Sequence, residues 1–365
     1  MNKVIISDKQ AISLVILFIW GSALVLGTAG EAQKNMWFAI LLGMILASLI
    51  IYIYCKILSS FDGLDVFDIN LLVFGSFAGN IINILYIMYA YTLGALVLNN
   101  FSEFISAVGL PETPKVAAVF PIVLLALLAV KSGIETLGRW AEFFILFLFL
   151  IVIIPTILGI PQMELNNIRP FMEDGIRPVI KGAIGAFSFP FAETVIFLMV
   201  FSCLKNKRSV FSAYYLGLWI AGLVFTAISV RNILIIGPEL LSRNYFPSYI
   251  VIARINVADF VQRIETLNTV SFLIAGFIKI SLCLLAAANG LNKIFRFEDY
   301  RILVTPAALT MFAVSFKTYD NIIETVNWVK EVYPYYAAIF QVILPIITFI
   351  GIKIKKKNTA SDGLQ

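Results

Sequence analysis

The chain contains no histidine, and this absence excludes histidine-based catalytic triads, histidine-ligated metal sites and imidazole proton relays. Its three cysteines, Cys55, Cys203 and Cys283, lie far apart, each in or beside an apolar run. They therefore suggest neither a disulfide framework nor a Cys-x-x-Cys metal site. Charged residues are also scarce, at 13% of the 365 residues, whereas soluble domains have about 25%. An ordinary soluble enzyme does not fit this composition.

Apolar residues take the place of the missing charge: 60% of the chain is hydrophobic and its mean hydropathy is +0.93. A helix that crosses the hydrocarbon core needs about 20 mostly apolar residues. We find no phosphate-binding loop, catalytic carboxylate pair or nucleophile elbow, so we expect no enzyme, cofactor or metal. The sequence predicts an all-α polytopic membrane protein with ten transmembrane helices, at about 8–29, 35–56, 71–99, 114–131, 139–160, 179–203, 211–234, 263–290, 300–317 and 334–354.

Lysine and arginine residues in the connecting loops indicate the orientation, because cytoplasmic loops carry an excess of them. With the N-terminus inside, the basic loops 204–208 and 291–301 and the Lys353–Lys357 segment all fall on the cytoplasmic side. We therefore expect both termini in the cytoplasm. Residues 1–365 would form a single transmembrane domain, in which 355–365 is a basic and polar cytoplasmic tail.

The ten spans divide into two repeats of five, over about 8–160 and 179–354. Spans one and six both carry backbone-breaking residues near their middles, namely Gly21-Ser22 and the segment from Gly185 to Pro190. Because five is an odd number, the second repeat inserts upside down relative to the first. Interrupted helices at matching positions of inverted repeats mark midplane binding sites in transporters. We therefore predict a leucine-transporter-type fold with broken helices 1 and 6; the alternative is that these residues serve close helix packing.

The interrupted segments are the predicted ligand-binding site. Lipid cannot satisfy the freed backbone groups, which suit a zwitterion: its carboxylate meets half-helix N-termini and its ammonium meets half-helix C-termini. A polar stripe in span three either contacts the ligand as well or serves helix–helix hydrogen bonding. The candidate residues are Gly21, Ser22 and Ala23 in span one, Asn83 and Tyr86 in span three, and Phe187, Ser188, Phe189 and Pro190 in span six.

Two charged residues lie within the predicted spans, and such residues are costly and functional by default. Glu193 follows Pro190 by about one turn, where it would pair with a cation, take a proton, hold the broken helix or lie at the interface. Lys279 lies deep in span eight. Its ammonium would occupy the place that sodium takes in sodium-coupled relatives, or pair with Glu193 or another buried acid. We assign both residues to a buried charge or gating role.

Several fragments, in their order along the chain, resemble one known family. They are Asp8-Lys9-Gln10-Ala11-Ile12, Leu110-Pro111-Glu112-Thr113-Pro114, Gly133-Ile134-Glu135, Gly138-Arg139-Trp140-Ala141-Glu142, the Phe-rich stretch through Glu193, Phe246-Pro247 and Gln262-Arg263-Ile264-Glu265. With the size and the ten spans, they resemble the B subunits of spore germinant receptors, or endospore germination permeases, in the amino acid–polyamine–organocation superfamily. That superfamily often has Gly-x-Gly in its first helix, where this chain has Gly21-Ser22-Ala23.

The resemblance implies a nutrient-sensing subunit in the inner membrane of a bacterial endospore. It would bind a small germinant, an amino acid, and trigger germination together with a receptor A subunit and a lipoprotein C subunit. The alternative on the same fold is a secondary amino acid transporter, proton-coupled or uncoupled. We expect no nucleic-acid partner, because the Lys353–Lys357 segment is charge beside the membrane that fixes topology.

Overall fold

The computed structural model describes residues 5–109, 111–204, 206–255, 264–317 and 322–362, and its long elements are all helices. Eight helices in this part of the chain are long and apolar enough to cross a membrane, as a multi-pass membrane protein requires. They are Gly30–Leu58 (η1, Gly30–Asn35, with α3, Met36–Leu58), α4 (Val66–Val108), α5 (Lys115–Ser132), α6 (Ile134–Gly159, continued by η2, Ile160–Gln162), Ile176–Met199, α8 (Lys207–Ile236), α11 (Glu265–Phe295) and Tyr333–Lys357.

Two of the ten expected spans are not among these eight. The run at 8–29 is divided into α1 (Asp8–Trp20) and α2 (Ala23–Leu26), because Gly21 leaves helical geometry with φ 10° and ψ −115°. The run at 300–317 forms α12 (Arg301–Ser315), whose 15 residues are fewer than the about 20 that a perpendicular crossing needs.

The helix that begins at Ile176 also changes its geometry partway along. It passes from α7 (Ile176–Ala186) through the π-helical turn η4 (Phe187–Phe191) into the 3₁₀ segments η5 (Ala192–Met199) and η6 (Phe201–Cys203). Phe189 has extended dihedrals, φ −138° and ψ 115°. Proline disfavours the α conformation of the residue before it and removes a backbone donor, so Pro190 accounts for the change.

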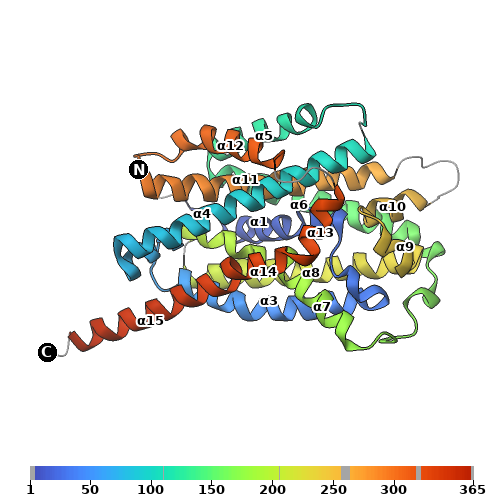
Figure 1. Ribbon diagram of the computed structural model, residues 1–365, viewed down its shortest axis with the longest axis horizontal. Helices are drawn as coiled ribbons and strands as arrows, with labels where there is room; N and C mark the ends of the chain where they lie inside the picture. The colour runs from blue at the N-terminus through green and yellow to red at the C-terminus, as the bar shows by residue number, and fades with distance from the viewer. Residues whose placement is uncertain (1–4, 110, 205, 256–263, 318–321, 363–365) are drawn as a thin grey trace.

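The long helices lie lengthwise beside one another, with α1 in their midst (Figure 1). Residues Leu14–Trp20 are almost fully buried, because α1 packs against α6, α8 and α11. Helices α5 and α12 cover α4 and α11 on one edge. Two short helices, α9 (Pro238–Arg243) and α10 (Pro247–Arg254), lie at the end opposite the C-terminal helix, and a third, α13 (Ile322–Glu331), lies nearer the middle of the molecule.

The start of α4 folds back on itself at Gly75, whose φ of 77° favours glycine. The Asn70 amide donates to Asn83 Oδ1 (2.9 Å), and Asn83 Nδ2 donates to the Phe67 carbonyl (3.1 Å). Asn83 therefore fastens this helical hairpin.

The remaining elements are the 3₁₀ turn η3 (Leu165–Ile168), α14 (Tyr333–Ala338), the π turn η8 (Ile339–Ile343) and α15 (Leu344–Asp362). Helix α15 runs on through the segment expected as a tail, so 355–362 is helical.

Candidate functional site

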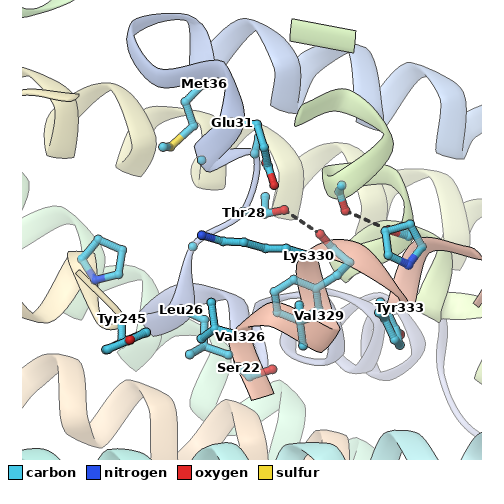
Figure 2. Close-up of a pocket in the computed structure, with 18 of the residues that line it drawn as sticks. Ser22, Leu26, Thr28, Glu31, Met36, Tyr245, Val326, Val329, Lys330 and Tyr333 are labelled. Atoms are coloured by element: carbon cyan, nitrogen blue, oxygen red, sulfur yellow. Dashed lines mark hydrogen bonds between the residues drawn. The ribbon is translucent and has the colours of Figure 1, made fainter. Parts of the chain in front are cut away.

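A cavity of about 590 Å³ reaches the interruptions of both divided helices (Figure 2). It lies toward the end of the molecule that holds α9 and α10, and residues of α9 contribute to its wall. Its walls come from α2 and the loop after it, α3, α4, α7–η5, α8, α10, α13 and α14. The lining residues used below are Ser22, Leu26, Glu31, Lys181, Ser188, Phe189, Glu193, Ser229, Asn232, Ser248, Lys330 and Tyr333.

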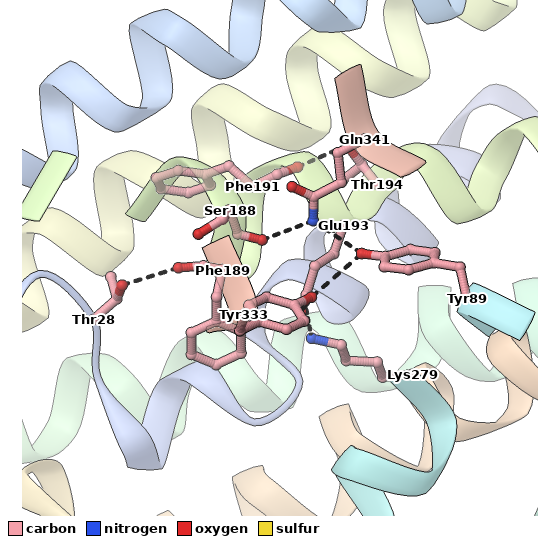
Figure 3. Close-up of polar contacts among 10 residues, drawn as sticks. All are labelled: Thr28, Tyr89, Ser188, Phe189, Phe191, Glu193, Thr194, Lys279, Tyr333 and Gln341. Carbon is pink, nitrogen blue, oxygen red and sulfur yellow. Dashed lines mark hydrogen bonds and ion pairs between the residues drawn. The ribbon is translucent and has the colours of Figure 1, made fainter. Parts of the chain in front are cut away.

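Glu193 at the cavity wall forms a fully buried ion pair with Lys279 (Figure 3). The exposed fractions of the two side chains are 1% and 0%. Lys279 Nζ donates to Glu193 Oε2, and the Tyr333 hydroxyl donates to Oε1 at 2.5 Å. The ammonium also lies 5.1 Å from the Phe18 ring centroid and 5.2 Å from that of Phe189. Both carboxylate oxygens are thus occupied and the negative charge is neutralised.

Gln341 in η8 extends this polar cluster toward the interrupted helix. Its Nε2 donates to the Tyr89 hydroxyl and to the Ser188 carbonyl, each at 2.9 Å (Figure 3). The Thr28 hydroxyl donates to the Phe189 carbonyl at 2.9 Å. These contacts satisfy carbonyls that the change of helix type frees, as a membrane interior requires.

Arg231 in α8 is a second buried cation, with an exposed fraction of 3%. It donates from Nε (3.1 Å) and Nη2 (2.7 Å) to Asn232 Oδ1, and from Nη1 to Thr156 Oγ1 (3.4 Å). Asn232 Nδ2 donates to Ser248 Oγ at 3.0 Å, and both of these residues line the cavity.

The structure brings five of the expected residues together: Ser22, Ser188, Phe189 and Glu193 line the cavity, and Lys279 binds Glu193. Of the two pairing alternatives for Lys279, the structure has the pair with Glu193. Gly21 lies against the Lys279 side chain, where a Cβ would overlap Cδ. Six expected ligand contacts are not among the lining residues: Gly21, Ala23, Asn83, Tyr86, Phe187 and Pro190. The Asn83 amide is held within α4, as described above, so the structure uses it for a contact within this helix.

Sequence reasoning missed Arg231, Ser248, Tyr333 and Gln341, as well as the wall from α13. Arg231 falls near the end of the run 211–234, where a basic residue looks like loop charge. Its position within that run was the available signal. The other residues lie in or beside short helices whose contacts depend on distant parts of the chain.

Comparison with known proteins agrees with this architecture. The model of the family described as "Spore germination protein" matches residues 5–323. Spore germination protein KB of Bacillus subtilis (strain 168) is 28% identical over 362 residues, which cover 98% of this chain and 97% of that protein. Spore germination protein GerQB of Bacillus cereus is 21% identical over 331 residues, covering 88% and 89%.

Solved structures show a similar fold at low identity. MHP1, a nucleobase-cation-symport-1 family transporter in a closed conformation with bromovinylhydantoin bound, has a TM-score of 0.72 at 14% identity, covering 95% of this chain and 78% of that one. MhsT in complex with L-phenylalanine has a TM-score of 0.66 at 10% identity, covering 97% and 99%. The architecture is therefore that of leucine-transporter-type proteins. The family match over most of the chain confirms the resemblance seen in the sequence: the chain belongs to the spore germination permease family.

Proposed function

We propose that this chain is the nutrient-sensing B subunit of a spore germinant receptor. It binds a small germinant, an amino acid, in the cavity and thereby triggers germination. The observation that carries the proposal is that the cavity reaches Ser22 and Ser188–Phe189, where both divided helices lose regular geometry, in a chain of this family. To signal, the germinant must bind one conformation more tightly than another, since equal affinity shifts no equilibrium.

The fold proposed for this function has ten spans in two inverted repeats of five. In it, α1 with α2 forms span one, Ile176–Met199 forms the broken span six and α12 forms span nine. The dihedrals of Gly21 and Phe189 support it, because they interrupt corresponding helices of the two halves. Ser22 contributes a hydroxyl, Ser188 a carbonyl and Phe189 a ring, while Gly21, Ala23, Phe187 and Pro190 shape the two interruptions.

The chain would reside in the inner membrane of a bacterial endospore with both termini in the cytoplasm. The exposed Lys353, Lys355, Lys356 and Lys357 on α15 support this orientation. The cavity would then open away from the cytoplasm, toward incoming nutrients. A receptor A subunit and a lipoprotein C subunit would complete the complex.

The test is germination of spores that lack this chain, followed as the loss of optical density on amino acids, sugars and nucleosides. We expect one amino acid response to disappear while the other responses stay intact. An unchanged profile in a strain with no second receptor of this family contradicts the proposal.

Two variants test the site itself. Gly21→Leu should abolish the response to the germinant while the chain still accumulates in spore membranes, as checked by immunoblot. Phe189→Ala removes a ring from the cavity without adding bulk and should raise the germinant concentration needed for half-maximal response. Normal responses from both accumulated variants would contradict this assignment of the site.

The alternative is a secondary amino acid transporter, proton-coupled or uncoupled. The likeness to transporters and the buried Glu193–Lys279 pair beside the cavity favour it. It predicts saturable, pH-dependent amino acid uptake by the purified chain in liposomes, and absence of uptake counts against it.

A further inference from the structure

The Arg231 guanidinium is buried and meets only neutral oxygens. Its hydrogen bonds are with Asn232 and Thr156, and no carboxylate within the described residues forms an ion pair with it. Burying a charge is expensive unless a counter-charge or a polar network compensates it. An anion that binds nearby would therefore gain from this positive charge.

Two of the three hydrogen bonds of Arg231 are directed to Asn232, which lines the cavity. A guanidinium only donates, so the Asn232 atom that faces Arg231 Nε and Nη2 must be the amide oxygen. The NH₂ group of Asn232 therefore faces Ser248. Ser248 Oγ accepts from that group at 3.0 Å. Its own hydroxyl proton has no acceptor in the described part of the chain, and Ser248 lines the cavity. The series of hydrogen bonds from Arg231 through Asn232 to Ser248 thus ends in a hydroxyl donor that is available to a ligand.

Two more hydroxyls line the same cavity without a partner among the described residues. Ser22 Oγ and Ser229 Oγ are buried, with exposed side-chain fractions of 0% and 4%, and neither makes a hydrogen bond. Helix α10, which carries Ser248, packs on both α2, which begins directly after Ser22, and α8, which carries Ser229. Buried hydroxyls normally find partners, and a ligand oxygen would supply one.

The charges around the cavity also favour an anionic group. Lys181, Arg243 and Lys330 line it, and Figure 2 shows the Lys330 side chain reaching from α13 into this space. Glu31 is the carboxylate that opposes them, since Glu193 is already paired with Lys279. The balance of charge along the walls is therefore positive.

We propose that the wall formed by α2, α8 and α10 binds a carboxylate of the ligand. Ser248, Ser229 and Ser22 donate to it, and Arg231 is a positioning residue that acts through Asn232. This deepens the proposed function, because it rests on the ligand occupying this cavity. In this proposal the ligand carboxylate binds at the wall formed by α2, α8 and α10, whereas the sequence pattern predicted it at the N-termini of the half-helices.

The test uses the full-length chain in lipid nanodiscs, probed with the L-amino acids and with their C-terminal amides by thermal shift and calorimetry. We expect at least one acid to bind, and its amide to bind at least 10-fold more weakly. Ser248→Ala and Arg231→Gln should each weaken binding of the acid about 10-fold. Each should also bring the ratio of the affinity for the acid to the affinity for the amide toward one. Arg231→Lys, which keeps the charge, should restore part of that ratio.

Ser281→Ala is the matched control, because Ser281 is another buried serine without a hydrogen bond but is not among the lining residues. This variant should leave both the affinity for the acid and the ratio of acid to amide affinity unchanged. Equal binding of acid and amide, absence of binding by every acid, or full retention of the ratio in Ser248→Ala overturns the proposal. If the purified chain binds the carboxylate as expected but spores that lack the chain germinate normally, the receptor function is overturned and the carboxylate site is not.

Discussion

Two cations are buried in the described part of the chain, and their surroundings are opposite. Lys279 meets the Glu193 carboxylate directly and links α11 to the segment after the π turn. Arg231 meets the amide of Asn232 and the hydroxyl of Thr156, with no acid within the described residues. A neutralised pair holds helices together and contributes little field at a distance, whereas an unneutralised cation keeps its attraction for an anion. Burial alone therefore does not assign a role to a charged residue; its partner does.

The largest effect should follow from breaking the Lys279 pair. Lys279→Met leaves the Glu193 carboxylate buried without a counter-ion, which costs about 3–5 kcal/mol of stability. Thermal unfolding in detergent should show a large fall in Tm, or loss of the folded chain. The double variant Lys279→Met with Glu193→Gln removes both charges and should regain most of the loss. A double variant no more stable than the single one would contradict the pair's role.

The second-largest effect on stability should follow from a substitution at Gly21, which contacts Lys279. A Cβ at position 21 would overlap Lys279 Cδ and lie 2.9 Å from the Phe18 carbonyl oxygen, so Gly21→Ala must displace the paired lysine or the backbone. Overpacking of this kind costs about 1–3 kcal/mol. Gly30→Ala is the control, since a Cβ there meets nothing within 4 Å. Equal Tm values for the two variants would show that Lys279 adjusts freely.

A smaller effect on stability is expected at the second cation. Arg231→Gln removes a buried charge without leaving a carboxylate unpaired, so the change in stability should stay within about 1 kcal/mol. The comparison is direct: Lys279→Met should lower Tm far more than Arg231→Gln does. If the two variants unfold alike, Arg231 has a counter-charge and the contrast between the cations fails.

The smallest effect on stability concerns a charge cluster where α4 begins and α11 ends. Lys293 Nζ lies 2.6 Å and 2.8 Å from the two Asp68 carboxylate oxygens, and 4.0 Å from Asp65. Burial, together with the Asp68 charge, raises the pKa of Asp65 from its ordinary 3.8 to about 7. The folded state then binds a proton that the unfolded state has released, so this group's contribution to stability falls as pH rises from about 4 to 7.

Asp65→Asn removes this pH dependence but keeps an amide oxygen that can cap α4, since Asp65 accepts from the Asp68 backbone. We expect the Tm of the wild type to fall more between pH 5 and pH 8 than that of the variant. Identical slopes would show that Asp65 is ionised throughout this range.

Local features of the chain were readable from the sequence. The apolar runs predicted most of the long helices, and Gly21 and Pro190 lie where the structure loses helical geometry. Such features can be read locally because hydropathy over 20 residues and the backbone preferences of Gly and Pro are properties of a short segment. The same local view left two uses open for Asn83, ligand contact or hydrogen bonding between helices: a polar stripe shows that an amide needs a partner, but not that Phe67 and Asn70 supply it.

By itself, the sequence determined a polytopic helical membrane protein with interrupted helices and an acid and a base within its apolar runs. Only the tertiary structure decided that Glu193 pairs with Lys279, 86 residues away, while Arg231 has neutral neighbours. It also decided that α10, α13 and α14 complete the cavity walls. The physical reason is that the cost of a buried charge depends on groups from other helices, and their positions are set by packing over the whole molecule.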